Sequence, residues 1–133
     1  MAQKTTKKYR WKDLDLDFIP HPATNDIAKK YDAEAIKRSI RSLVQTRFYE
    51  RLFQPDIGTN VQDLLFDLAT PSTASIIQRQ IEDVIINFEK RAQLIEVEVV
   101  ADNMGRSYTI NITFLIINQP EPIQFQFILE RTR

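Results

Sequence analysis

The hydrophobic residues of this chain change their spacing near residue 90, and this switch constrains the fold more than any other feature. Before it, an apolar stripe recurs at the spacing of a helix face through about five turns. After it, apolar and polar residues alternate, as on a strand with one buried face. The chain must therefore join a long amphipathic helix to a sheet that follows almost directly. The stripe consists of Ala74, Ile77, Ile81, Val84, Ile85 and Phe88.

The long helix has a clear start. Thr70 is a favoured capping residue, and Pro71 follows at the first helical position, where its missing N–H costs nothing. A second helix is predicted after Asp32 as its N-cap. Its apolar face comprises Ala33, Ile36, Ile40, Leu43 and Val44. A short third helix is predicted from Asn60, with Val61, Leu64, Leu65 and Leu68 pointing inward.

Three strands are predicted after the helices, at residues 94–99, 107–117 and 123–129. Turn residues separate them at 102–105 and 118–122. Helices followed by a three-stranded antiparallel meander indicate an α+β fold, with the meander packed on the long helix. The last strand lies at a sheet edge, where its open N–H and C=O groups are either covered by the chain's own helix or available to a strand from another protein.

The N-terminal residues divide into two parts. Residues 1–12 are basic and contain no acid, which predicts a flexible tail; residues 13–133 are predicted to form one domain. The domain opens with an extended segment in which aspartates alternate with apolar residues, so the aspartates are expected on its solvent face. The aspartates are Asp13, Asp15 and Asp17; the apolar residues are Leu14, Leu16 and Phe18.

Composition excludes several functions for the 133-residue chain. Lys+Arg 18 against Asp+Glu 18 leaves no net charge, so no overall basic field attracts nucleic acid. Two glycines cannot build a glycine-rich phosphate loop, and the absence of cysteine excludes disulfides and thiol chemistry. No apolar run approaches the roughly 20 residues that span a bilayer. We expect that the protein has no cofactor or metal site, binds neither nucleic acid nor membrane, and is located inside a cell.

Catalysis is limited to carboxylates, because His21 is the only histidine. A muramidase would need one protonated acid and a second carboxylate about 5–9.5 Å away. Glu89 beside an apolar helix end is the candidate acid, with Glu50 or Asp56 as the second group. However, Lys90 and Arg91 would hold Glu89 ionised. The enzyme is therefore the alternative hypothesis, and partner binding is favoured.

Glu89 and Arg91 stand two positions apart, and residues at that spacing in a helix do not face each other. They are therefore expected to point in different directions, as contacts to another chain or as solvated residues at a fraying helix end. The aromatic and charged loop at 46–60 is long enough to suspect a function. A small adaptor protein is a further alternative.

Several short motifs follow one another in a characteristic order. They are D-L-D-L-D-F from residue 13, A-I-x-x-S-I-R-x-L at 35–43, T-x-x-x-E-R-x-F-x-P-x-x-G at 46–58, L-L-F at 64–66, Thr-Pro at 70–71 and F-E-x-R at 88–91. In this order the chain resembles, over residues 13–129, the baseplate wedge family of contractile-tailed phages. That family was once described as lysozyme-like and includes a baseplate component of the type VI secretion system.

The chain departs from this family at two positions. Family members carry Glu-Pro-Arg where this chain has Glu89-Lys90-Arg91, so the long helix is expected to fray later. They carry Gly-Glu-Arg where it has Tyr49-Glu50-Arg51. Position 49 therefore either needs no positive φ or bears a cost there.

The resemblance implies a non-enzymatic structural protein of the virion tail baseplate, assembled in the bacterial host cytoplasm and present in six copies per ring. It implies docking on a helical bundle of wedge scaffold proteins through Glu89 and Arg91, supported by Arg47, Glu50, Arg51 and Phe53. It also implies initiation of the tail sheath by strand addition along residues 123–129. The sheath-binding residues would be Ile123, Phe125, Phe127 and Leu129, and tail tube or hub proteins are further candidate partners.

Overall fold

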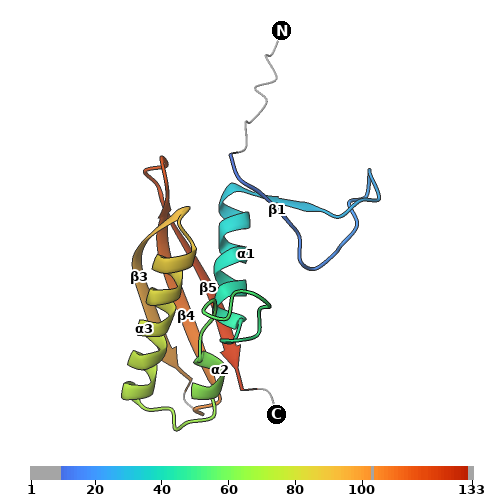
Figure 1. Ribbon diagram of the computed structural model, residues 1–133. Helices are drawn as coiled ribbons and strands as arrows, with labels where there is room; N and C mark the ends of the chain where they lie inside the picture. Colours follow the sequence, from blue (N-terminus) through green and yellow to red (C-terminus); the bar gives the residue numbers. More distant parts are fainter. Residues whose placement is uncertain (1–9, 103, 132–133) are drawn as a thin grey trace.

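The structure, a computed structural model, describes residues 10–102 and 104–131. Three helices precede a three-stranded sheet: α1 (Asp32–Gln45), α2 (Val61–Leu64) and α3 (Pro71–Phe88), then β3 (Ala92–Ala101), β4 (Ser107–Ile116) and β5 (Pro122–Glu130). Figure 1 shows α1 and α3 side by side against the sheet. Their apolar faces and one face of the sheet form a single hydrophobic core. This confirms the predicted α+β fold class.

The sheet is an antiparallel meander in the order β3-β4-β5, as predicted. In the central strand every second residue is buried against the helices: Tyr108, Ile110, Ile112, Phe114 and Ile116. The β3–β4 register shifts between Leu94 and Glu96, which marks a bulge at Ile95. Each strand differs from its predicted range by no more than a few residues, because alternation locates a strand better than its ends.

Helix α3 begins as its sequence indicates. The Thr70 side chain accepts a hydrogen bond of 3.2 Å from the backbone N–H of Thr73, and Pro71 occupies the first turn. The expectation that α3 frays later without the proline is wrong. The helix ends at Phe88, and Glu89 leaves it with φ −109° and ψ 76°.

The predicted role of Asp32 at the start of α1 is also wrong. The N-cap is Tyr31, and no side chain caps the helix. Asp32 Oδ1 instead accepts hydrogen bonds from the backbone N–H groups of Arg10 (2.9 Å) and Trp11 (3.0 Å). In the short helix, Val61 and Leu65 are buried as expected, but Leu68 lies beyond its end and is exposed.

Residues 10–31 form an N-terminal arm that the sequence indicated only as an extended segment. In it, β1 (Lys12–Leu14) pairs antiparallel with β2 (Lys29–Tyr31), and the loop between them projects to one side of the helices (Figure 1). Of the predicted tail, residues 1–9 lie outside the described part. Residues 10–12 belong to the arm, so the arm begins before the predicted boundary at residue 13.

Across residues 10–102 and 104–131, none of the helices combines the length and apolar character that a membrane span requires. The same residues contain no group of three or more His, Cys, Asp or Glu placed to hold a metal ion.

Candidate protein-binding site

Glu89 and Arg91 contact each other, contrary to the prediction that they point apart. Arg91 Nε donates to Glu89 Oε1 at 2.7 Å, and Nη2 donates to Oε2 at 2.8 Å. The prediction failed because it assumed one continuous helix through both residues. Since α3 ends at Phe88, the turn that follows folds the guanidinium back over the carboxylate. The result is a bidentate, charge-assisted pair, the strongest common geometry for these groups.

The pair is largely withdrawn from water. Glu89 is only 3% exposed. Burial by itself raises the pKa of Glu89, but hydrogen bonds from Arg91 and Ser39 and the Arg91 charge outweigh it and hold that pKa below its ordinary value. The pKa of Arg91 is raised, chiefly by its hydrogen bonds to Glu89. Glu89 is therefore ionised at neutral pH, which does not suit a general acid.

Trp11 and Asp13 of the N-terminal arm contact this pair. We call the four residues Trp11, Asp13, Glu89 and Arg91 the Glu89 cluster. Arg91 Nη1 donates to Asp13 Oδ2 at 3.0 Å, and the guanidinium lies 5.9 Å from the centre of the Trp11 ring. Arg91 thus joins the end of α3 to the beginning of the arm.

The prediction that Asp13, Asp15 and Asp17 all face solvent is wrong for Asp15, which is buried, while Asp17 stays exposed and pairs with a base at the surface. Asp15 is 3% exposed and lies 3.3 Å from the ammonium of Lys30. Asp17 forms an ion pair with Arg38 of α1. Each of the three aspartates meets a base from a different part of the chain. The apolar side chains of this segment are exposed: Leu14, Leu16 and Phe18, with Ile19 following.

The loop at 46–60 is held by hydrogen bonds within itself and to α2. Arg47 donates its backbone N–H to Glu50 Oε2 at 2.9 Å and its Nε to Gln62 Oε1 at 2.7 Å. Gly58 has φ +145°, and a Cβ there would lie 2.7 Å from the carbonyl carbon of Arg47. Tyr49 has φ +66°, so the position needs the left-handed conformation although it is not glycine. Of the two possibilities that the sequence left for position 49, the chain bears the cost.

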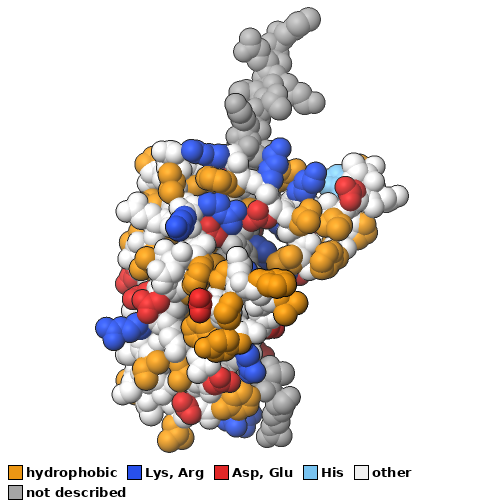
Figure 2. All heavy atoms as spheres, viewed as in Figure 1, with side chains coloured by type: hydrophobic (Ala, Val, Ile, Leu, Met, Phe, Trp, Pro, Cys, Tyr) orange, Lys and Arg blue, Asp and Glu red, His pale blue; other side chains and the backbone are white. Residues whose placement is uncertain are grey.

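The predicted docking residues of this loop divide into two kinds. Glu50 binds the backbone of Arg47 and the Arg47 side chain binds α2, whereas Arg51 and Phe53 face outward, and Phe53 is fully exposed. Tyr49 and Leu52 are exposed beside them. Figure 2 shows hydrophobic side chains gathered on this face, over the loop and the arm.

A groove connects the loop to the arm and to the end of α3. Its lining comes from four segments: Asp13, Leu14 and Leu16 of the arm, Ala35, Arg38, Ser39, Ser42 and Leu43 of α1, Arg51 and Ile57 of the loop, and Phe88 of α3. Of the residues predicted to dock on the scaffold, Arg51 alone lines this groove, and Phe88 lines it next to Glu89 at the end of α3. Sequence reasoning missed the arm as part of it. The sequence signal that could have indicated the arm was its row of aspartates, whose charge is complementary to the basic residues on the polar face of α1.

The predicted sheath-binding side chains lie on the buried face of β5. Phe127 and Leu129 are in the core, and Phe125 packs edge-on against Phe114 with ring centres 6.0 Å apart. Ile123 is partly buried against the same core. These side chains therefore hold the sheet on the helices, and that they also give an added strand its fit stays a prediction. The backbone edge of β5 remains the part that another strand could reach.

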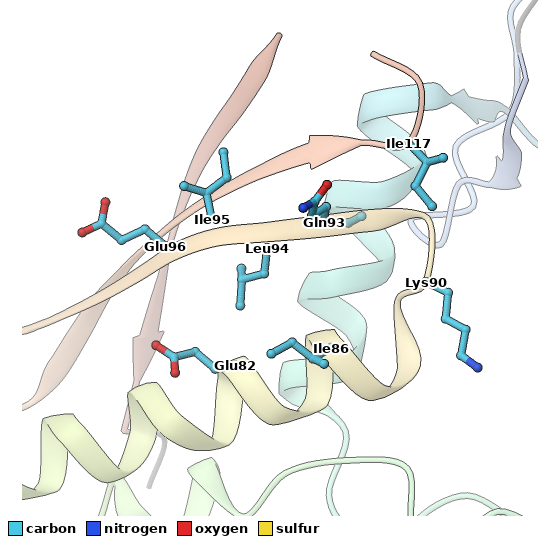
Figure 3. A pocket seen from close by; sticks show the side chains of 9 residues that line it. Glu82, Ile86, Lys90, Gln93, Leu94, Ile95, Glu96 and Ile117 are labelled. Carbon is cyan, nitrogen blue, oxygen red and sulfur yellow. The ribbon is translucent and has the colours of Figure 1, made fainter. Parts of the chain in front are cut away.

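A second groove lies between α3 and β3 (Figure 3). Leu94 points toward α3, whereas Ile95 at the bulge points to the opposite side of the strand. Ile86 and Ile117 add apolar lining, and Glu82, Glu96 and Lys90 are the charged residues. None of the residues predicted to bind a partner lines this groove.

Comparison with known families decides what kind of protein carries this surface. Residues 30–121 match the family of the baseplate wedge protein gp25. The chain belongs to this family. The match confirms the resemblance carried by the motifs and includes the loop, α3, the Glu89–Arg91 pair and most of the sheet.

Relatives of this wedge protein include the baseplate wedge protein gp25 of Enterobacteria phage T4, which is 30% identical over 99 residues, 74% of this chain and 75% of the T4 protein. A Geobacter sulfurreducens protein with the provisional name of tail lysozyme has a similar fold. Its TM-score is 0.67 at 22% identity, covering 75% of this chain and 91% of that one.

Chains from two large assemblies share the fold as well. One is from the six-fold symmetrised baseplate of the anti-feeding prophage, with a TM-score of 0.63 at 20% identity over 92% of this chain and 87% of that one. The other is from the baseplate complex of the type VI secretion system, with a TM-score of 0.58 at 14% identity over 72% and 92%. Family membership makes this wedge protein a structural component of the baseplate of a phage tail or phage-like particle.

Proposed function

We propose that this protein is a non-enzymatic wedge subunit with two working surfaces. One surface, formed by the Glu89 cluster and the loop at 46–60, docks on the wedge scaffold proteins. The other, the backbone edge of β5, starts the tail sheath by accepting a strand. The six-fold symmetry of the related anti-feeding prophage baseplate supports six copies per ring.

The docking role rests chiefly on the exposed apolar side chains of an internally bonded loop. Phe53 is 100% exposed, and Tyr49 and Leu52 are nearly as open. Clustered large apolar groups cost free energy in water, and such patches typically mark interaction sites. Both Tyr49 and Phe53 have φ +66°. Strained backbone of this kind persists at sites where it serves a function.

The Glu89–Arg91 pair has capacity left for a partner. A guanidinium carries five N–H donors, and Arg91 uses one each from Nε, Nη1 and Nη2 within the chain. The remaining donors on Nη1 and Nη2 belong to a side chain that is still 22% exposed. A partner carbonyl or carboxylate at this site would receive hydrogen bonds from a cation that the chain already holds in position.

The sheath role is supported by the position of β5 at the edge of the sheet, paired in the described residues with β4 alone. Arg131 donates its backbone N–H to the Arg106 carbonyl, which extends the β4–β5 ladder by one pair. Because pairing alternates along an antiparallel strand, residues 123, 125, 127 and 129 also face β4. The N–H and C=O groups of Gln124, Gln126, Ile128 and Glu130 therefore point away from the sheet, where a sheath strand can bind them.

The muramidase alternative lacks a suitable acid. A general acid needs a raised pKa, whereas the pKa of Glu89 is lowered by Arg91. A zymogram on peptidoglycan with the purified protein tests this directly. We expect no clearing; clearing by the wild type that Glu89→Gln abolishes would establish the enzyme instead.

The docking role is tested by removing the exposed rings of the loop. Particles are produced without the wild-type protein and with the double variant Tyr49→Ser and Phe53→Ser in its place. The assembled baseplates are then counted after sedimentation. We expect a loss of at least tenfold in assembled baseplates with an unchanged folded monomer. Leu68→Ser is the matched control, because Leu68 is equally exposed but lies away from the loop. Normal baseplate yield with the double variant would overturn the docking role.

A further inference from the structure

The hairpin of the N-terminal arm ends in a tip that stands clear of the domain. Every residue from 18 to 26 is exposed, and we call this segment the arm tip. The backbone hydrogen bonds that shape it stay within the arm: Ala28 N–H donates to Ile19 O at 3.2 Å, and His21 N–H donates to Asp26 O at 2.8 Å. Figure 1 shows the arm tip beyond α1, on the side away from α3 and β3.

The arm is held in one position at its base. The strands β1 and β2 pack on α1. Two ion pairs fasten the segment that leads to the arm tip, Asp13 with Arg91 and Asp17 with Arg38. A preformed element of this kind loses little conformational freedom when it binds.

The arm tip carries large apolar side chains in water. Phe18 is 65% exposed and Ile19 is 59% exposed, and Pro20 beside them is exposed as well. Figure 2 shows hydrophobic side chains along this projection. Placing them on an apolar surface would release free energy, because it removes their area from water. The family match at 30–121 does not reach the arm tip, so family membership assigns it no role.

The groove between α3 and β3, which we call the α3–β3 groove, offers such a surface. It encloses about 740 Å³, a size that holds several side chains. Ile86 and Ile117, which are 63% and 45% exposed, line it together with Leu94 (Figure 3). Neither the loop at 46–60 nor β5 contributes to its lining. The α3–β3 groove therefore stays open when both surfaces of the proposed function are occupied.

The charges of the arm tip and of the groove are compatible. The charged residues of the groove are Glu82, Lys90 and Glu96. Those at 17–29 on the arm are Asp17, Asp26 and Lys29, and Asp17 is already paired with Arg38. Within residues 10–102 and 104–131, neither Lys29 nor Lys90 forms an ion pair. Lys29 therefore matches the glutamates of the groove, and Asp26 matches its Lys90, whereas an occupant with one sign of charge would match only part of it.

The arm tip and the groove cannot meet within one chain, because they lie on opposite sides of the domain (Figure 1). Two identical chains can bring them together. A contact between two different surfaces of identical subunits is heterologous, so it repeats from copy to copy and closes into a ring when the rotation between copies fits. The proposed function places several copies of this chain around one ring.

We infer that the arm tip of one copy inserts Phe18 and Ile19 into the α3–β3 groove of a neighbouring copy. This contact joins the wedge subunits around the baseplate. The inference rests on the proposed function, because that function sets the copies side by side. It gives the arm a task separate from docking on the scaffold and from starting the sheath.

Paired cysteines test this contact, since the chain contains no cysteine of its own. Phe18→Cys is combined with Ile86→Cys in the full-length protein, and assembled baseplates are treated with a short bismaleimide linker. We expect a ladder of covalently joined copies on a denaturing gel, because each copy contributes one arm tip and one groove.

The matched control combines Phe18→Cys with Ile76→Cys. Ile76 is also an exposed residue of α3, but it does not line the groove and lies roughly 15 Å from Ile86 along the helix axis. The yield of joined copies should be at least tenfold lower in the control. Ladders of equal yield would overturn the inference.

Isotope labels distinguish contact between copies from contact within one copy. Baseplates are assembled from equal amounts of light and heavy protein, and the linked peptides are identified by mass spectrometry. We expect peptides that join residue 18 of one label to residue 86 of the other. Links that never mix the labels, or links from residue 18 only to another baseplate protein, would overturn the inference.

Incorporation separates a failure of this inference from a failure of the function on which it rests. If the paired-cysteine variant enters baseplates at the wild-type level but yields no link between residues 18 and 86, the contact between copies is wrong and the wedge function stands. If the wild-type protein is absent from purified baseplates, the wedge function itself fails.

Removing the apolar side chains of the arm tip gives a second readout without a linker. The double variant Phe18→Ser and Ile19→Ser should keep the stability of the isolated protein, because both residues are exposed. It should enter single wedges normally and reduce closed baseplates at least fivefold, as counted by electron microscopy. Leu68→Ser is again the control. An unchanged number of closed baseplates would contradict the contact.

Discussion

Arg91 and Asp13 lie 78 positions apart in the chain, and a hydrogen bond of 3.0 Å joins Nη1 of the arginine to Oδ2 of the aspartate. This contact links the end of the long helix to the arm that precedes all the helices. Glu89 holds the same guanidinium from the other side. The residue pair that the sequence suggested as a docking point is therefore also an internal joint.

Replacing Glu89 by Gln should destabilise the protein. The change leaves the guanidinium of Arg91 partly buried without its main charge partner, at a cost of about 2 kcal/mol at pH 7. Urea unfolding followed by circular dichroism measures it. Glu96→Gln, at an exposed carboxylate of β3, is the control and should change stability by less than about 0.5 kcal/mol.

The same variant should flatten the dependence of stability on pH. Burial by itself raises the pKa of Glu89, but Arg91 lowers it by more. The pKa of Glu89 in the folded protein is therefore below the ordinary value of 4.5. As pH falls, the unfolded chain takes up this proton first, so stability present above pH 4.5 is lost as pH falls through the folded pKa. Between pH 3 and 5, Glu89→Gln should lose less stability than the wild type. A slope equal to that of the wild type would show that the pair does not set the acid limit.

Tyr49→Gly should stabilise the free protein. Tyr49 has φ +66°, which costs a residue with a Cβ about 1 kcal/mol, and its exposed ring contributes little to the core. Thermal unfolding should show a higher midpoint for Tyr49→Gly. Tyr49→Ala keeps the backbone cost and should not show the gain. If alanine stabilised as much as glycine, the ring rather than the backbone would be the cause.

Gly58→Ala should destabilise the loop. The new Cβ would lie 2.7–2.8 Å from the backbone of Arg47 and Thr46, and φ +145° is strained for any L-residue. A loss of about 2 kcal/mol or more is expected, together with faster hydrogen exchange at Thr59, whose N–H donates to Thr46 O. Wild-type stability would mean that the loop can move away from this contact at little cost.

Gln126→Pro should block sheath assembly and leave the baseplate intact. Proline removes an N–H that points away from β4 and places its ring on the free edge, where proline is tolerated within a sheet. Deleting the strand is a poorer test, because Phe127 and Leu129 belong to the core. Gln126→Ala keeps the N–H and should support normal sheath, which electron microscopy of tails would show. Normal sheath on Gln126→Pro baseplates would contradict strand addition at β5.

The helices and strands were predictable because their signals are local. The stripe from Ala74 to Phe88 and the alternation within 107–117 each arise from neighbours a few positions apart. The Thr70–Pro71 start is equally local and is confirmed. The family followed from motifs in order, and residues 30–121 confirm it.

The errors at the candidate site have one origin. The end of α3 at Phe88 let Arg91 turn back to Glu89, and the bases that anchor the aspartates come from three separate segments. Similarly, Asp32 was available as a cap but serves the backbone of Arg10 and Trp11. Such partners are distant in sequence, so local spacing could not identify them.

The sequence by itself determined where the three helices and the strands of the meander form, and that acidic and apolar residues alternate at 13–18. Only the tertiary structure decided which of those two sets of residues meets the protein. Alternation specifies two sets of side chains in a segment, but the set that turns inward depends on which side chains of the rest of the protein it can contact. Here Arg91, Lys30 and Arg38 each pair with one aspartate, and the buried Asp15 carboxylate costs less beside a base than it would unpaired. The apolar side chains Leu14, Leu16 and Phe18 are left exposed.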